Sequence, residues 1–161
     1  AGLNLAVLPL LNHWLRDFQV VHLTGSGFEN NLEHDSTPFS HPDYHPLEAV
    51  HEGMGDLLAK SEIVITRAGM GIIGELAVLQ KDTVLIPLPG THQEENARLI
   101  QENCASECVS QEVLATEGIK WWNNFLEKRI PGEMGKKLQN LLPDGGTKDF
   151  GKLVVEMTSK G

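Results

Sequence analysis

The chain of 161 residues is poor in cysteine, in positive charge and in long apolar runs. Its two cysteines, Cys104 and Cys108, cannot build a disulfide framework and are typical of reduced intracellular thiols. Thirteen basic against 22 acidic residues give a formal net charge of −9, which argues against nucleic acid or anionic lipid as a partner. No apolar run reaches the roughly 18 residues of a membrane-spanning helix, and no export signal opens the chain. We therefore expect a soluble protein.

The length predicts a single domain over residues 1–161, with a core over about 1–112 and additional helices over 113–161. Apolar segments that predict strands alternate with segments of helical periodicity, and this alternation predicts an α/β fold: a Rossmann-like, doubly wound parallel sheet with flanking helices. The expected strands are 18–24, 46–50, 62–66, 83–87 and 107–110. The expected helices are 3–15, 53–60, 71–79, 93–103, 119–128, 132–142 and 147–159.

The most informative segment is 61–75, where a buried strand, a glycine turn and the start of a helix follow one another. Gly69, Gly71 and Gly74 form a G-x-G-x-x-G pattern, which lets the backbone approach an anion closely. The free N–H groups and the positive dipole end of the following helix point at such an anion. Together with the backbone amides, Arg67 is the local source of positive charge. The pattern predicts a nucleotide site.

The position of the acidic residue decides which nucleotide is expected. A dinucleotide-binding unit has its ribose-binding acid about 20 residues after the glycines, but the strand over 83–87 has no acid at its tip. Glu75 instead lies one helical turn after Gly71 on the same face, where it can accept hydrogen bonds from two ribose hydroxyls. The alternative interpretation is that Glu75 only complements the helix dipole.

Three motifs occur in order: T-R-A-G-x5-E-L at 66–76, L-I-P-L-P at 85–89 and H-Q-x-x-N-A at 92–97. They resemble the carboxyl-terminal half of the MurG family, the peptidoglycan N-acetylglucosaminyltransferases of the two-domain GT-B fold. The resemblance implies that this half binds UDP-N-acetylglucosamine, with Glu75 on the ribose and the turn 69–72 on the diphosphate. His92 and Gln93 would touch the sugar, and Asn96 would brace their loop.

The same resemblance places the uracil pocket at 50–54, where the His51 backbone would read the base edge and Met54 would lie near its face. A pair of glutamines often stands in the family where this chain has His92 and Gln93, and a His-Gln pair is also common there. The residues assigned to UDP-sugar binding are therefore His51, Met54, Arg67, Gly69, Met70, Gly71, Ile72, Glu75, His92, Gln93 and Asn96.

The resemblance further implies an inverting hexosyltransferase that transfers N-acetylglucosamine to an undecaprenyl-linked muramyl-pentapeptide at the cytoplasmic face of the plasma membrane. The acceptor-binding amino-terminal half is absent from these 161 residues and would supply the general base, so no catalytic residue is assigned here. This chain alone is expected to bind UDP without turnover. No metal or other cofactor is expected, because helix dipole and amides can stabilise the leaving diphosphate. An exposed sheet edge would favour self-association of the isolated domain.

Other interpretations remain open. A UDP-sugar epimerase would use a similar turn but needs further acidic and basic groups in its cleft. A separate-subunit or non-catalytic UDP-sugar-binding module would also fit the chain length, and an NAD-binding domain is disfavoured by the missing acid. The histidines and aspartates at His34, Asp35, His41, Asp43 and His45 match no usual metal-ligand spacing and predict a solvated loop. The apolar stripe of Trp121, Trp122, Phe125 and Leu126 predicts core or interdomain packing.

Overall fold

The computed structural model describes residues 2–28 and 40–142. The chain divides into two compact units, which are described separately below: Ala1–Met54 with Gln111–Asn124, and Gly55–Ser110 with Phe125–Gly161. The helix predicted over 147–159 lies outside the described residues, as do His34 and Asp35. The prediction of one domain over the whole chain stays a prediction.

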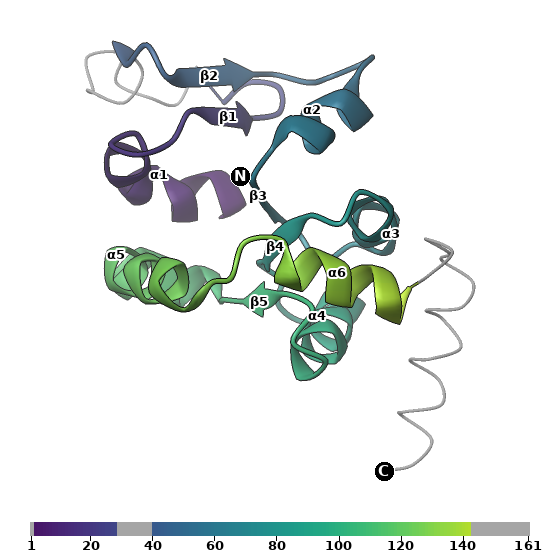
Figure 1. The fold of residues 1–161 in the computed structure, drawn as a ribbon. Coiled ribbons are helices and arrows are strands. Elements are labelled where there is room, and N and C mark those ends of the chain that lie inside the picture. Colours follow the sequence, from purple (N-terminus) through teal and green to yellow (C-terminus); the bar gives the residue numbers. More distant parts are fainter. Residues whose placement is uncertain (1, 29–39, 143–161) are drawn as a thin grey trace. The chain divides into compact units, whose positions relative to one another are not determined.

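The first unit contains α1 (Gly2–Trp14), β1 (Val20–Leu23), β2 (Tyr44–Leu47) and most of α5 (Gln111–Lys128), as Figure 1 shows. The two strands run parallel, with Val20 opposite Tyr44. Helix α5 bends at Glu117, whose φ of −129° and ψ of 16° are not helical. The next residue, Gly118, faces α1, where an added Cβ would lie 2.8 Å from Leu10 Cδ2. The glycine therefore allows the two helices to approach closely.

Aromatic rings fill the core of this unit. Trp14 and Trp122 have ring centroids 5.1 Å apart, and Phe18 meets Trp122 edge-on at 6.1 Å. Trp122 is 4% exposed, which confirms that this part of the predicted apolar stripe is core. Phe125, which belongs to the second unit, is also buried.

A polar cluster joins the start of α1 to the strands of the same unit. His22 Nδ1 lies 2.8 Å from the Tyr44 hydroxyl, and its Nε2 lies 3.3 Å from Asn4 Oδ1. Asn4 Nδ2 donates to the Thr24 carbonyl oxygen at 2.6 Å. Burial lowers the pKa of His22, so this imidazole favours its neutral form more than a solvated histidine does.

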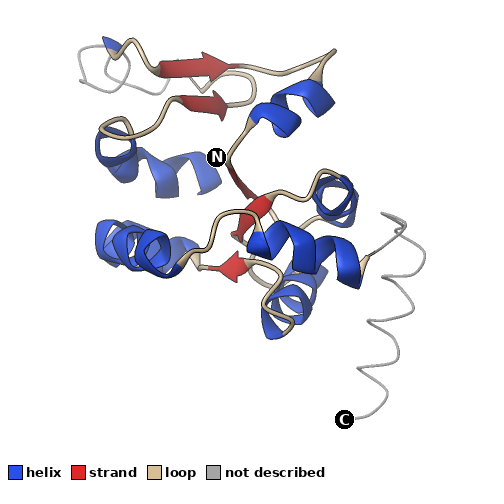
Figure 2. Ribbon diagram, viewed as in Figure 1, coloured by secondary structure: helices blue, strands red, loops and turns tan. Residues whose placement is uncertain are grey.

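The second unit is built on a three-stranded parallel sheet in the order β3 (Ile63–Thr66), β4 (Asp82–Leu85) and β5 (Glu107–Cys108). All four residues of β4 are buried, as expected for a central strand covered on both faces. Figure 2 shows these strands among helices. The helices of this unit are α2 (Met54–Lys60), α3 (Met70–Val78), α4 (His92–Glu102) and α6 (Glu133–Leu141).

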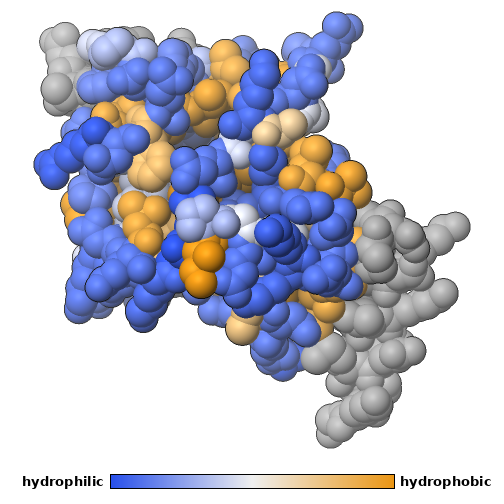
Figure 3. Space-filling view, viewed as in Figure 1, coloured by the Kyte–Doolittle hydropathy of each residue, from blue (hydrophilic) through white to orange (hydrophobic). Residues whose placement is uncertain are grey.

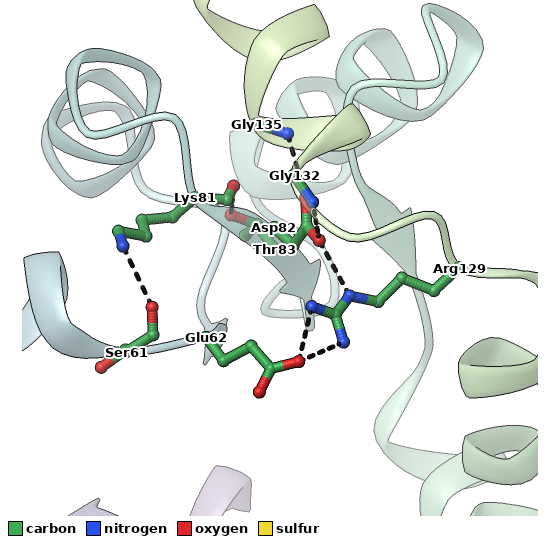
Figure 4. A network of polar contacts seen from close by, with 8 residues as sticks. All are labelled: Ser61, Glu62, Lys81, Asp82, Thr83, Arg129, Gly132 and Gly135. Atoms are coloured by element: carbon green, nitrogen blue, oxygen red, sulfur yellow. Dashed lines mark hydrogen bonds and ion pairs between the residues drawn. The ribbon is translucent and has the colours of Figure 1, made fainter.

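Helix α6 packs against α3 and β4, and its first turn is held by a buried carboxylate (Figure 4). Asp82 accepts hydrogen bonds from the N–H groups of Gly132 at 2.8 Å and Gly135 at 3.2 Å. A Cβ on Gly135 would lie 2.0 Å from the Gln80 carbonyl oxygen. No side chain larger than hydrogen fits at this contact, so the helix rests directly on the backbone that leads into β4.

The same carboxylate pairs with Arg129, whose Nε lies 2.8 Å from Asp82 Oδ2, and the guanidinium also reaches Glu62 Oε1 at 2.9 Å. The Arg129 and Asp82 side chains are 6% and 1% exposed. Burial lowers the pKa of Arg129, and hydrogen bonds to Asp82 and Glu62 raise it by more, so that it lies above its ordinary value. The buried charges therefore compensate each other at the amino end of β4.

The alternation of parallel strands and helices confirms the predicted α/β class, while the sheet arrangement and the starts of β2 and α5 differ from the prediction. The five strands lie in two sheets, of two and three strands, instead of one continuous sheet. Strand β2 begins at Tyr44, within the predicted loop, because this aromatic side chain is buried beside β1. Helix α5 begins at Gln111, ahead of the predicted start at 119.

Hydrophilic residues cover most of the face drawn in Figure 3, with apolar groups between them. Within residues 2–28 and 40–142, the most exposed large apolar side chains are those of Leu5, Val78 and Ile130, at 63%, 57% and 63%. Among the described residues, no helix has both the length and the apolar character needed to cross a membrane.

Candidate functional site

The loops that follow β3 and β4 meet at the carboxyl edge of the three-stranded sheet, where ligands of open α/β sheets bind. The backbone bond from the Ile86 N–H to the Thr66 carbonyl oxygen, 2.8 Å long, joins the two loops where they leave the sheet. The first loop leads through Ala68 into α3, and the second leads through Gly90 into α4. Two helix N-termini of one unit therefore begin at this edge.

The glycine turn before α3 is open. Gly69 is the N-cap residue, with φ −77° and ψ 144°, and no side chain caps the helix. A Cβ on Gly71 would meet nothing within 4 Å. The N–H groups of Met70, Gly71 and Ile72 precede the first intrahelical bond and donate to no other described residue. They are donors available to a bound anion.

Glu75 lies on the same exposed face of α3 as Gly71, whereas Ile73, Leu76 and Ala77 are buried against the rest of the unit. This division follows the 3.6-residue period of the helix. Because helical side chains lean toward the N-terminus, the Glu75 side chain extends toward the open turn. The structure therefore places an acid and the uncapped turn on one exposed face of α3.

Arg67 is half-buried and points across the edge of the sheet to the other loop. Its Nη1 donates to the carbonyl oxygens of Ile86 at 3.0 Å and Pro87 at 3.2 Å. Burial lowers the pKa of this guanidinium. The sequence predicts that Arg67 supplies positive charge to the ligand. The structure adds two hydrogen bonds from Arg67 to the protein backbone, which the motif did not predict.

Asn96 is 7% exposed and ties α4 to the glycine turn, since its Nδ2 donates to the Ala68 carbonyl oxygen at 3.0 Å. It was expected to brace the loop at His92 and Gln93, and the contact in the structure is with the turn before α3. Ala68 is fully buried. The amide of Asn96 thus fixes the backbone directly ahead of the open N–H groups.

The first turn of α4 holds the loop over 88–91. Gln93 Oε1 accepts from the Leu88 N–H at 3.1 Å, and the Gln93 N–H donates to the N-cap Thr91 Oγ1 at 3.2 Å. The Gly90 N–H donates to Glu94 Oε2 at 3.0 Å. The His92 side chain, by contrast, is fully exposed, with Nδ1 4.0 Å from Glu95 Oε2.

An open hollow of about 510 Å³ adjoins this turn, lined by Gly90, Thr91, His92, Glu94 and Glu95. Its position at the carboxyl edge of the sheet suits a ligand that extends from the α3 turn toward α4. Gln93 has its side-chain oxygen committed to the loop, while the exposed imidazole of His92 is accessible to a bound group.

The two residues predicted for the uracil pocket belong to the first unit. His51 is exposed in the segment between β2 and α2, and Met54 is half-buried at the first position of α2. Between them, Gly53 has a φ of +81°, a left-handed conformation that glycine adopts without strain. The chain therefore turns sharply at this point, and the predicted roles of His51 and Met54 stay predictions.

Among the residues considered as metal ligands, His41 and Asp43 make ordinary loop contacts, whereas His45 lies in strand β2 opposite Val21 and not in the predicted loop. His41 Nδ1 accepts from the Asp43 N–H at 3.2 Å, and Asp43 Oδ1 accepts from Gln19 at 3.2 Å. Within residues 2–28 and 40–142, no group of three or more His, Cys, Asp or Glu side chains could hold a metal ion.

The two cysteines are free thiols. Cys108 Sγ donates to the Ala97 carbonyl oxygen at 3.2 Å, and burial raises its pKa to about 11. A thiol with so high a pKa carries little thiolate near neutral pH and is a poor nucleophile. Cys108 is thus a packing residue, and Cys104 is exposed.

These features define the class: a parallel α/β unit with an uncapped helix N-terminus at the carboxyl edge of its sheet and an acid one turn into that helix. Residues 3–122 match the family model for the glycosyltransferase family 28 C-terminal domain. The chain belongs to this family, and the resemblance drawn from its three motifs is confirmed.

Two similar relatives carry the name UDP-N-acetylglucosamine--N-acetylmuramyl-(pentapeptide) pyrophosphoryl-undecaprenol N-acetylglucosamine transferase. The protein of Lachnospira eligens is 40% identical over 113 residues, which are 68% of this chain and 30% of the relative. A Clostridium perfringens protein is 34% identical over 119 residues, or 71% of this chain and 32% of the relative. The chain thus spans about a third of the length of the curated relatives it matches.

The fold is also that of a solved structure. The crystal structure of Acinetobacter baumannii MurG matches 96% of this chain and 46% of its own, with a TM-score of 0.75 and 20% sequence identity. This likeness confirms the predicted fold class, the carboxyl-terminal half of a GT-B protein.

Proposed function

We propose that this chain is the donor-binding part of an inverting glycosyltransferase that transfers N-acetylglucosamine from UDP-N-acetylglucosamine to an undecaprenyl-linked muramyl-pentapeptide in peptidoglycan synthesis. Family membership and the printed names of the relatives support the reaction. The observation that carries the assignment to this part of the enzyme is the open turn before α3, with its unpaired N–H groups and the exposed Glu75 on the same face.

The chemistry of that turn fits a nucleoside diphosphate. Backbone amides and the positive end of α3 would bind the diphosphate, and they would stabilise it more as negative charge grows during cleavage of the glycosidic bond. Glu75 would accept hydrogen bonds from the two ribose hydroxyls. His92, beside the open hollow at α4, would meet the sugar, and His51 with Met54 would bind uracil.

The acceptor and the general base would come from residues beyond these 161. We propose that the complete enzyme meets its lipid-linked acceptor at the cytoplasmic face of the plasma membrane. We propose also that no metal or other cofactor takes part, because the amides of α3 supply the electrostatic stabilisation that a cation would otherwise give. Self-association of the isolated chain, through its sheet edges, is part of the same proposal.

Calorimetry with UDP, UDP-N-acetylglucosamine, GDP and NAD tests the donor assignment. We expect binding of the two uridine nucleotides, unchanged by a chelator, and much weaker binding of GDP and NAD. Sedimentation velocity on the same samples reports the oligomeric state. A preference for NAD would overturn the proposal. Transfer of N-acetylglucosamine to the acceptor by this chain alone would contradict the proposal that the acceptor site and the general base lie outside it.

A further inference from the structure

We propose that Arg67 is a positioning residue that couples the diphosphate end of the donor site to its sugar end. The inference rests on the proposed function, because it presupposes a nucleotide sugar that spans both ends. It replaces the role of direct diphosphate ligand that the position of Arg67 beside the glycine turn suggests.

The argument begins with where the guanidinium is directed. Arg67 follows β3 directly, and its Nη1 donates to two successive carbonyl oxygens, those of Ile86 and Pro87, at 3.0 and 3.2 Å. These carbonyls belong to the segment between β4 and α4. Nη1 has two hydrogens, so this nitrogen satisfies its donor capacity within the protein. The side chain therefore fastens the second loop to the first.

Two further hydrogen bonds connect the second loop to the glycine turn through α4. The second loop is fixed to the first turn of α4 by the bond from the Leu88 N–H to Gln93 Oε1. Asn96, one turn further along α4, donates to the carbonyl oxygen of Ala68, the residue after Arg67. Loop, helix and glycine turn thus form a closed hydrogen-bonded ring. A displacement of one part is transmitted to the others because each joint is a bond of 3.0–3.2 Å.

The two ends of the ring carry different parts of the predicted donor site. The diphosphate donors at Gly71 and Ile72 follow the joint at Ala68, and the sugar-side residue His92 follows the loop that Arg67 holds. Without Arg67, the bond from Asn96 and the helical bonds of α3 still hold the diphosphate donors. The loop before His92 loses the two Arg67 bonds that hold it directly to the residue beside the glycine turn, and keeps the Ile86–Thr66 backbone bond and the indirect path through α4. Arg67 therefore governs the distance between the two ends and not the strength of the anion site itself.

The test compares UDP and UDP-N-acetylglucosamine binding to the wild-type chain, Arg67→Met and Arg98→Met. Arg98 is an exposed residue of α4 paired with Glu102 at 3.3 Å, so its removal is a matched loss of one positive charge. We expect Arg67→Met to bind UDP within about threefold of wild type, with the same salt dependence. The ratio of the dissociation constant for UDP-N-acetylglucosamine to that for UDP should change by about fivefold, because a change of this size corresponds to the loss of roughly one net hydrogen bond. Arg98→Met should leave this ratio unchanged.

A direct contact between Arg67 and the diphosphate gives a different result. UDP affinity would then fall by about tenfold or more in Arg67→Met, and its salt dependence would become shallower. Either that result or an unchanged ratio overturns the inference. If the wild-type chain binds neither uridine nucleotide, the proposed function fails first, so the two failures are distinguishable.

A second variant, Arg67→Lys, and amide hydrogen exchange distinguish a local positioning effect from a general loss of stability. Lysine keeps the charge but lacks the planar, multi-donor head, so the ratio should still change while UDP affinity is retained. The Leu88 N–H should exchange faster in both variants, and the Gly132 and Gly135 N–H groups, bound by Asp82 elsewhere in the unit, should not. Equal acceleration at all three amides would indicate general destabilisation and contradict a local positioning role.

Discussion

The N-termini of α3 and α6 lie in the same unit and both start at a glycine N-cap, yet their backbone donors have different partners. At α6, the N–H groups of Gly132 and Gly135 donate to the buried carboxylate of Asp82. At α3, no side chain caps the helix and the space at Gly71 is empty. A helix N-terminus favours an anion. The protein supplies one for α6 from within, and we propose that a ligand supplies one for α3.

Helix α4 has an intermediate arrangement. Its N-cap Thr91 accepts from the Gln93 N–H, which satisfies one donor without introducing charge. Glu94 and Glu95 in the first turn complement the dipole. An anionic group is therefore disfavoured at α4 relative to α3, and a neutral sugar suits the open hollow beside it.

The largest effect should come from removing the internal anion of α6. Asp82→Ala leaves the Arg129 guanidinium buried without its closest partner and two N–H groups unsatisfied, so we expect the free energy of unfolding to fall by about 3–5 kcal/mol. Urea titration measures it. Glu62→Ala, which removes the exposed partner of Arg129, should cost less than about 1 kcal/mol. Equal losses in the two variants would contradict the burial argument.

Gly135→Ala should disturb the same contact by steric overlap. A Cβ 2.0 Å from the Gln80 carbonyl oxygen forces α6 away from β4, and overpacking of this kind costs about 1–3 kcal/mol or more. Thermal unfolding reports the loss. Gly55→Ala in α2, where a Cβ meets nothing within 4 Å, is the control and should not destabilise. A stable Gly135→Ala protein would show that α6 docks differently.

At α3, Glu75→Ala should affect ligand and not fold. We expect UDP binding to weaken by about 1–3 kcal/mol, the scale of losing hydrogen bonds to a charged group, with little change in the melting temperature. Glu127→Ala, an exposed acid in the same unit, controls for net charge. Calorimetry on both variants decides, and undiminished UDP affinity in Glu75→Ala would reject the ribose role.

Gly71→Ala should change the stability only modestly, and in the direction opposite to that of Asp82→Ala and Gly135→Ala. The helix gains up to about 1 kcal/mol because alanine is the better helix former, and nothing obstructs the added methyl group. The methyl group should hinder the approach of a diphosphate, so pyrophosphate and UDP should bind more weakly while uridine binding is retained. Losses that are equal for uridine and UDP would point to a fold defect instead.

The sequence predicted α3 and its turn because the signals there are local. Gly69, Gly71 and Glu75 lie within seven residues, and period and glycine chemistry alone place them on one helix. Strand β4 was found for a similar reason, as an uninterrupted apolar run. Its first residue, Asp82, was not singled out, although an acid heading a fully buried strand is a signal for a compensating partner.

The partners of Asp82 and Arg67 could not be predicted, since both depend on tertiary contacts. Arg129 and Gly135 are far from Asp82 along the chain, and no periodicity connects them. Arg67 was interpreted through its neighbours in sequence, but its hydrogen bonds go to the following loop. The start of β2 at Tyr44 was missed because polar residues surround that aromatic side chain, and its burial depends on pairing with β1.

The partners of Asp82 lie far along the chain from it, and this separation affects how the protein folds during synthesis. The strand that begins with this acid leaves the ribosome well before residues 129–135 do, and until they arrive the carboxylate has neither its arginine nor its two amides. Placing a lone charge in the interior is unfavourable, so the nascent sheet should stay incompletely packed until that late segment emerges. The sheet is therefore expected to complete its folding only after residues 129–135 have been synthesised.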